Sequence, residues 1–246
     1  MKDNIKLLVP PYLQTLGYCD IPCIKKMSEK CFKEGDVFHP YWVEWRGIFD
    51  YLSCVEYSKQ NIDNLPKGID LFNNFCDVKS KYNSASLVFF SQATLDNIAV
   101  WLKDKYSLNS KGADISLSKN NFQNKLISEN ALFSEVFSKH RIFLDNLNTY
   151  RMDWIHRIIG GAMIGGDKRP NDPDFTDDNI GILIPMSSSL NFYTTKFEEI
   201  DEKIEKIKKN NNGNYLYSID EFSNYILSET KKLIFDIIEI ILPLFD

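Results

Sequence analysis

The sequence predicts an all-α protein, a helical bundle with a long central helix hairpin and a small glycine-rich insertion at about residues 160–188. Two observations predict this class. Apolar residues recur three and four positions apart through most of the chain, and long alternating runs are almost absent. In addition, 43% apolar and 13% aromatic residues in a chain of 246 are enough for a large buried core. No repeat or linker interrupts the pattern, so a single domain over residues 1–246 is expected.

The main helices are predicted from their apolar faces. Three long ones are expected at 41–61, 84–106 and 129–159, the last ending at Gly160-Gly161, where glycine can close a helix. Shorter helices are expected near 21–34 and 119–128, the latter opened by Ser118. The faces of the three long helices consist of Trp42, Trp45, Phe49 and Leu52; of Val88, Leu95, Ile98, Ala99 and Leu102; and of Leu132, Val136, Phe143, Leu147, Tyr150, Trp154 and Ile158.

The C-terminal part, residues 190–246, is predicted to form a helical hairpin. Its first arm, 190–209, has Tyr193, Phe197 and Ile200 at the start of a regular apolar stripe. Its second arm opens at Ser218, whose spacing from Glu221 has the form of a capping box. This arm is apolar on nearly all sides, so other helices should enclose it.

The insertion at 160–188 is the one region that does not resemble helix. It holds five of the eleven glycines and three of the nine prolines. Two short apolar runs, AMI and IGILI, are predicted to pair as strands around an acidic loop. The spacing of the loop's aspartates does not match a calcium-binding loop, so a solvated loop is expected.

Four potential zinc ligands, Cys19, Cys23, Cys31 and His39, lie within a short stretch in the pattern C-x3-C-x7-C-x7-H. Structural zinc sites usually have closer pairs such as C-x2-C, whereas free cysteine is often a buried apolar residue. Buried thiols are therefore expected in preference to zinc, and no metal or cofactor is assigned.

Charge and cysteine usage indicate the compartment. The formal net charge of −5 provides no global attraction to nucleic acid or to an anionic membrane. The odd number of cysteines and the absence of a signal-peptide pattern argue against a secreted, disulfide-bonded protein. The most apolar stretch, 233–245, is too short to span a bilayer and contains Asp236 and Glu239. A cytoplasmic protein that does not insert into membranes is expected.

The stretch NTYRMDWIHR, residues 148–157, has the strongest functional pattern. A histidine near neutral pKa suits proton transfer, and an arginine can bind a phosphate with two hydrogen bonds. Around His156 the helix end has a second apolar face, which either the insertion or another copy of the protein would cover. The alternative is structural: Asp153 pairs with Arg157 while the histidine caps the helix. His140, on the inner face of the same helix, is expected to be a hydrogen-bonded core residue.

Arg151 and His156 form the motif R-x4-H near the end of a long helix, and this resembles the HEPN superfamily (higher eukaryotes and prokaryotes nucleotide-binding). The resemblance covers about residues 40–160 as a HEPN-like core. Many members are metal-independent endoribonucleases of defence or toxin systems, and others are non-catalytic scaffolds. Met152 stands where active members often carry Asn, Asp or His.

Carried onto this chain, the resemblance implies that His156 acts as general acid or base on an RNA 2′-hydroxyl and that Arg151 binds the scissile phosphate. Tyr150, Asp153 and Arg157 would support the site. The implied partners are RNA, a second copy in a homodimer, and an antitoxin or regulatory protein. The alternative function is a non-catalytic helical interaction or regulatory module with a structural Arg/His pair.

Overall fold

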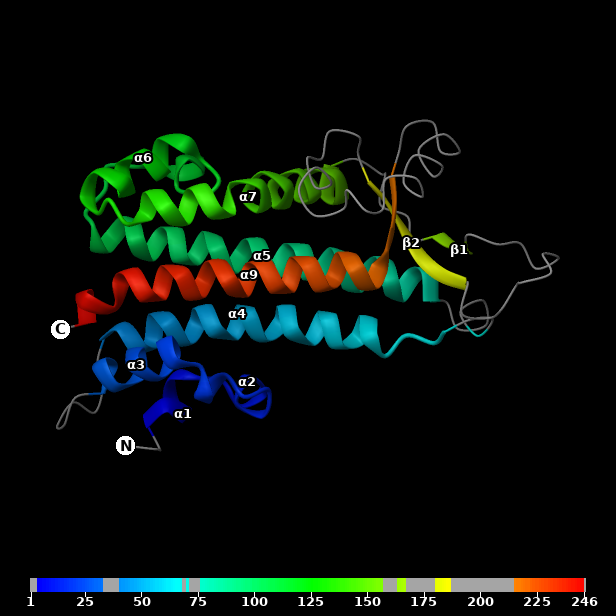
Figure 1. The fold of residues 1–246 in the computed structure, drawn as a ribbon, viewed down its shortest axis with the longest axis horizontal. Helices are drawn as coiled ribbons and strands as arrows, with labels where there is room; N and C mark the ends of the chain where they lie inside the picture. The colour runs from blue at the N-terminus through cyan, green and yellow to red at the C-terminus, as the bar shows by residue number, and fades with distance from the viewer. Residues whose placement is uncertain are drawn as a thin grey trace. The chain divides into compact units, whose positions relative to one another are not determined.

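The computed structural model describes residues 4–32, 40–67, 70, 76–156, 163–166, 180–186 and 215–245. It confirms the all-α bundle and adds a small antiparallel sheet (Figure 1). The helices are α1 (Asn4–Leu8), α2 (Pro11–Thr15), α3 (Pro22–Cys31), α4 (Pro40–Asp63), α5 (Cys76–Lys105), α6 (Asn120–Glu129), α7 (Phe133–His156) and α9 (Ile219–Ile241), and the strands are β1 (Met163–Gly166), β2 (Ile180–Met186) and β3 (Tyr215–Ser218).

The chain divides into two compact units. Unit 1 contains Met1–Val55, Phe90–Leu144 and Ser228–Asp246, and unit 2 contains Glu56–Phe89 and Asp145–Leu227. The boundary between them falls within α4, α5, α7 and α9. A single domain over residues 1–246 therefore stays a prediction.

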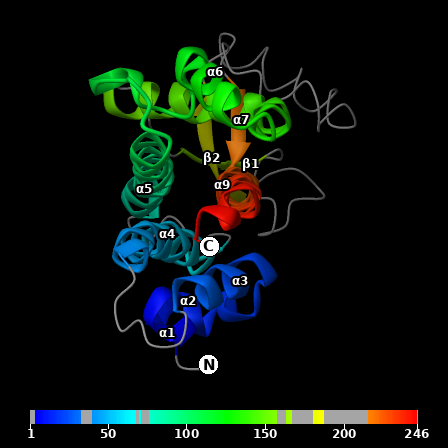
Figure 2. The ribbon, with the colours of Figure 1, turned by 90° about the vertical axis from the view of Figure 1, so that its left-hand side faces the viewer.

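In unit 1, segments of α4, α5, α7 and α9 are neighbours, and α1, α2 and α3 lie beside α4 (Figure 2). An aromatic cluster joins α4, α5 and the C-terminal 3-10 turn η7 (Leu242–Phe245). The Trp101 ring centroid lies 5.4 Å from that of Trp45 and 5.7 Å from that of Phe245. Glu44 accepts a 2.6 Å hydrogen bond from the Trp101 indole, so this buried polar group is satisfied.

The order of contacts confirms the long helix hairpin. Within unit 1, Glu44 of α4 contacts Trp101 of α5, and Tyr51, further along α4, contacts Phe90, which is earlier in α5. Rising numbers in one helix meet falling numbers in the other, so the two helices are antiparallel. The turn of the hairpin lies between Asp63 and Cys76.

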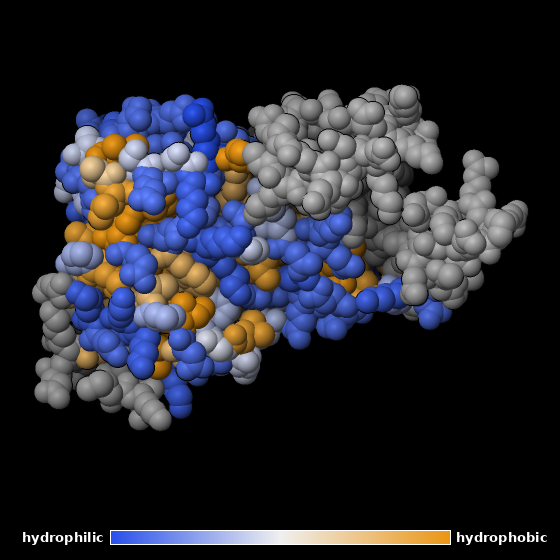
Figure 3. Space-filling view, in the orientation of Figure 1, coloured by the Kyte–Doolittle hydropathy of each residue, from blue (hydrophilic) through white to orange (hydrophobic). Residues whose placement is uncertain are grey.

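The predicted apolar faces are largely buried, although hydrophobic side chains also gather in patches on the face drawn in Figure 3. On α5 every predicted face residue is buried, and so are Val136, Phe143, Leu147 and Tyr150 of α7. Leu132 was expected to join them and does not, because it is 61% exposed. The Asn130 side chain accepts the Leu132 amide at 3.1 Å, which makes a turn there and delays the start of α7 to Phe133.

Other element boundaries differ from the prediction. α5 begins at Cys76, eight positions before the predicted 84, and α1 and α2 were not predicted. Ser118 does not open α6: its hydroxyl lies 3.0 Å from that of Ser116, and Lys119 stands at the N-cap. The predicted helix at 190–209 and the predicted stop at Gly160-Gly161 lie outside the described residues.

The glycine-rich insertion forms strands as predicted, with one addition. β1 pairs antiparallel with β2, with Ile164 opposite Ile182. β2 also pairs antiparallel with β3, with Ile184 opposite Tyr217. The third strand, YLYS, was not predicted. β3 ends at Ser218, and α9 begins at the next residue, as the predicted capping position requires.

One described helix segment, Val78–Lys105 of α5, is long and apolar enough to cross a membrane. This is weak support for a membrane span, because a core helix passes the same criteria and 56% of the apolar window is buried inside the fold. The same helix buries the hydroxyl residues Ser80, Ser84, Ser91 and Thr94.

Candidate functional site

The site predicted on α7 begins at Tyr150, which anchors the last turns of the helix in unit 2. Its side chain is 1% exposed, and its ring meets Phe222 of α9 edge-on, with centroids 5.0 Å apart and an interplanar angle of 78°. Because both residues belong to unit 2, this contact fixes which side of the helix faces inward there. Tyr150 is therefore a core residue that orients the helix.

Arg151 follows Tyr150 and is exposed. One residue turns an α-helix by about 100°, so burial of Tyr150 directs its successor away from the Phe222 contact. The guanidinium is thus accessible, and an exposed arginine suits a phosphate because it offers donors in a planar fork.

The other predicted site residues are described only in part. α7 continues to His156, so the helical backbone joins Arg151 to the histidine without a break. The side chains of Asp153 and His156 lie outside the described residues, and so does the whole of Arg157. The structure therefore gives a position for the motif's backbone and for one of its two reactive side chains.

Asn146 is a polar residue that the sequence analysis did not identify. It lies one turn before Tyr150 on α7 and is 2% exposed. Within the described part of the chain its amide nitrogen has no hydrogen-bond partner. Leaving a buried donor unpaired costs about 1–3 kcal/mol, so the inner face of α7 is partly polar just before the motif.

His140, in unit 1, is a second titratable centre on α7. It is 1% exposed, and its Nε2 lies 2.6 Å from Oδ2 of Asp236 on α9. Its Nδ1 lies 3.8 Å from a carboxylate oxygen of Glu229, also on α9. The expected hydrogen-bonded core histidine is found, and it joins α7 to α9. Its burial leaves the imidazole without access to a substrate.

Two lysines extend this cluster outward. Lys139 donates to the same oxygen of Asp236 at 2.6 Å, and Lys232 lies 2.8 Å from Glu229. Burial acts to raise the pKa of Asp236, but hydrogen bonds from Lys139 and His140 outweigh it, so the pKa is lowered. The sequence offered a signal for this pair. Asp236 interrupts the apolar run of α9 from Leu233 to Ile238, and His140 lies on an otherwise apolar face of α7.

The cysteines do not make a nucleophile or a metal centre in the described structure. Burial raises the pKa of Cys23 to about 11 and of Cys31 to about 12, so their reactive thiolate forms are disfavoured. Across the described residues, no three His, Cys, Asp or Glu side chains are grouped as metal ligands. His39, the fourth residue of the zinc pattern, lies outside them.

The motif therefore has an anchored tyrosine, an exposed arginine and a histidine further along one continuous helix. In comparisons with protein-family models, with curated proteins and with solved structures, no match was found.

Proposed function

We propose that this protein is a metal-independent endoribonuclease of a defence or toxin type, acting in the cytoplasm with Arg151 and His156 as its catalytic residues. The observation that carries the proposal is the exposed Arg151 on the helix that also contains His156. The resemblance of R-x4-H to HEPN nucleases supplies the reaction class.

In the proposed reaction, His156 takes the proton of an RNA 2′-hydroxyl, and the 2′-oxygen attacks the adjacent phosphorus. The bond from phosphorus to the 5′-oxygen breaks, and that oxygen receives a proton from water; the resulting hydroxide takes the proton that His156 holds. The products are a 2′,3′-cyclic phosphate and a 5′-hydroxyl end. Arg151 stabilises the charge that develops on the phosphate oxygens.

Helix geometry favours a site made by two copies of the chain. Arg151 and His156 are five positions apart, which corresponds to about 140° around an α-helix and about 7.5 Å along it. Side chains so directed diverge, so one phosphate is more easily reached by the arginine of one copy and the histidine of another. A symmetric dimer brings equivalent helices together.

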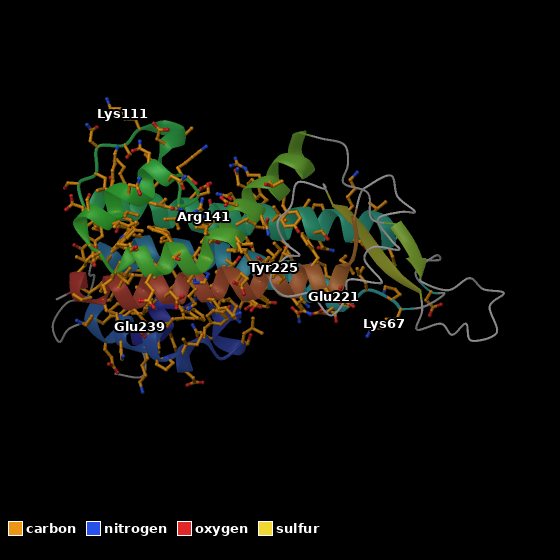
Figure 4. All side chains as sticks on the ribbon, turned by 45° about the horizontal axis from the view of Figure 1, so that its top comes forward. Lys67, Lys111, Arg141, Glu221, Tyr225 and Glu239 are labelled. Carbon is orange, nitrogen blue, oxygen red and sulfur yellow. The ribbon has the colours of Figure 1, made fainter. Side chains whose placement is uncertain are left out.

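The first experiment compares purified wild type with Arg151→Ala and His156→Ala on structured and single-stranded RNA in excess chelator. Cleavage should fall by about 100-fold or more in both variants, since loss of a general acid or base costs about 10²–10⁴ in rate. Arg141→Ala is the control, because Arg141 is another exposed arginine of α7 (Figure 4). Equal rates in all four proteins, or strict dependence on a metal, would rule the mechanism out.

A mixing experiment tests the composite site. Arg151→Ala and His156→Ala are combined after separate purification and exchange of subunits. In half of the dimers, one of the two sites would then hold both native residues, so roughly a quarter of the wild-type activity should return. No recovery would show that both residues act within one chain.

The formal charge of −5 favours a second candidate, a non-catalytic interaction or regulatory module. Expression in cells separates the two. Growth arrest and RNA degradation that depend on both residues support the nuclease, and they leave an antitoxin or regulatory protein as its natural partner. Identical behaviour of wild type and both variants supports the module.

A further inference from the structure

The buried ring of His140 on α7 lies between two carboxylates of α9 in unit 1. Its Nε2 lies 2.6 Å from Oδ2 of Asp236, and its Nδ1 lies 3.8 Å from Oε2 of Glu229. The two carboxylates are seven positions apart, so they share one face of α9 about 10 Å apart along its axis. One imidazole can therefore reach two successive turns of the neighbouring helix.

The shorter contact identifies the ring nitrogen that carries a hydrogen. Burial acts to raise the pKa of Asp236, but hydrogen bonds from Lys139 and His140 lower it from 3.8, so this carboxylate is ionised at neutral pH. An ionised carboxylate only accepts hydrogen bonds, so Nε2 is the donor. In a neutral imidazole with hydrogen on Nε2, Nδ1 is a bare acceptor.

Nδ1 of His140 is the unsatisfied atom of this cluster. It is buried, and within the described structure it has no hydrogen-bond partner. An acceptor nitrogen is not attracted to the carboxylate oxygen of Glu229, which accounts for a separation longer than a hydrogen bond. A second proton would make Nδ1 a donor, and a bond of this charged kind is about 2.7–2.9 Å long. A movement of about 1 Å would then close the gap.

The other charges of the cluster are two lysines. Lys139 of α7 pairs with Asp236, and Lys232 of α9 pairs with Glu229. The lysine side chains are 57% and 50% exposed, so water and salt screen their repulsion of a charged ring. Among the described residues, Asp236 and Glu229 are the carboxylates within ion-pair distance of the ring, and they are 29% and 12% exposed. A second proton on the ring would therefore meet attraction on both sides.

We propose that His140 is a pH-dependent clasp between α7 and α9: the neutral ring binds Asp236 alone, and the doubly protonated ring binds Asp236 and Glu229 together. Histidine side chains in general change charge between about pH 5 and 8. The clasp therefore tightens on mild acidification and loosens as the pH rises, because the bond to Glu229 needs the second proton. It lies in unit 1 and does not depend on RNA cleavage by Arg151 and His156.

NMR of the protein labelled with nitrogen-15 histidine tests the protonation states directly. The chain has three histidines, and the His140→Gln variant identifies the signals of His140. Between about pH 8 and about pH 5.5, Nδ1 should change from a bare to a protonated nitrogen, while Nε2 keeps its proton throughout. A bare Nδ1 at the lower pH, or a proton on Nδ1 in place of Nε2 at the higher pH, would overturn the clasp.

A double-mutant cycle measures the bond to Glu229. Urea unfolding is compared for wild type, His140→Gln, Glu229→Gln and the double variant at both pH values. The coupling should change the unfolding equilibrium constant by less than about twofold at the higher pH and by about tenfold or more at the lower pH, as expected for a hydrogen bond between charged groups. Titration of His39 and His156 cancels, because all four proteins contain them. Equal coupling at the two pH values would contradict the clasp.

Two further variants separate the imidazole from its neighbours. Lys232→Ala removes the cation that pairs with Glu229, and it should keep the wild-type change in stability between the two pH values. Glu135→Gln, at an exposed carboxylate of α7, should also keep it. Loss of the pH dependence in Lys232→Ala would assign the effect to the lysine and overturn the clasp. If Glu229→Gln does not fold, the nitrogen signals of wild type decide the question.

Discussion

His140 and Arg151 are two basic residues of one helix with opposite surroundings. They are eleven positions apart on α7, so by helix geometry they point within about 20° of each other. His140 is 1% exposed and touches Asp236 of α9, whereas Arg151 is exposed. Direction on the helix does not decide burial here. A side chain of α7 is buried where another helix packs against its side of the helix at that point along the axis.

The buried arc of α7 shifts along the helix. At its middle, His140 and Leu144 are buried, and near its end the arc is represented by Asn146 and Tyr150. The direction that faces the protein interior at His140 therefore faces solvent at Arg151. One basic side chain, His140, joins α7 to α9, and the other, Arg151, is open to a ligand.

The largest stability effect should come from Tyr150. Tyr150→Ala removes a buried ring that packs on Phe222, and the free energy of unfolding should fall by about 3–4 kcal/mol. Tyr150→Phe keeps the ring and its contact with Phe222, so it should cost much less than Tyr150→Ala. Urea denaturation of the three proteins measures this. A small loss for Tyr150→Ala would mean that the end of α7 is not anchored at this residue.

A slightly smaller loss is expected at His140. His140→Ala leaves Asp236 without its imidazole partner and opens a cavity, so unfolding should become easier by about 3 kcal/mol. The neighbouring Arg141→Ala, at an exposed position, is the control and should change stability by less than about 0.5 kcal/mol. Equal stability of the two variants would show that the cluster does not join α7 to α9.

The pH dependence of stability should reveal Asp236. Its pKa is lowered from 3.8 in the folded protein, so its contribution is present above about pH 4 and is lost as the pH falls through the folded value. Asp236→Asn should therefore differ most from wild type near neutral pH, and the difference should shrink below about pH 4. A constant difference from pH 7 to pH 3 would contradict the lowered pKa. Glu135→Gln, at an exposed carboxylate of α7, is the control.

The smallest effect is expected at Arg151. Because its side chain is exposed, Arg151→Ala should alter the free energy of unfolding by less than about 0.5 kcal/mol. Thermal and urea unfolding of the variant used for the cleavage assay would measure it. A loss above 1 kcal/mol would assign Arg151 a structural role and weaken its interpretation as a phosphate ligand.

Periodicity was sufficient to predict the long helices and most of their buried faces, because a helix with an apolar face is stabilised when that face packs against other helices. It failed at Leu132, where an asparagine side chain makes a local turn that spacing alone does not reveal. It also failed at β3, since a four-residue strand has too few alternations to distinguish it from a loop.

The candidate site was less accessible to sequence reasoning. Arg151 and His156 were identified from their spacing, but the contacts that orient the helix come from Phe222, far away along the chain. The pairing of His140 with Asp236 likewise joins residues 96 positions apart, and only the packing of α7 on α9 brings them together. In both cases the residue type gave a hint, and the tertiary structure supplied the partner.

The pairing of β2 with β3 sets a condition on how the chain can be redesigned. Met186 lies opposite Tyr215 in register, so the two ends of the intervening stretch, residues 187–214, are fixed next to each other. A stretch held at both ends in this way can be exchanged for a tight Asn-Gly turn without altering the distance it must bridge. A shortened chain that keeps the pairing of β2 with β3 would show what residues 187–214 contribute to activity.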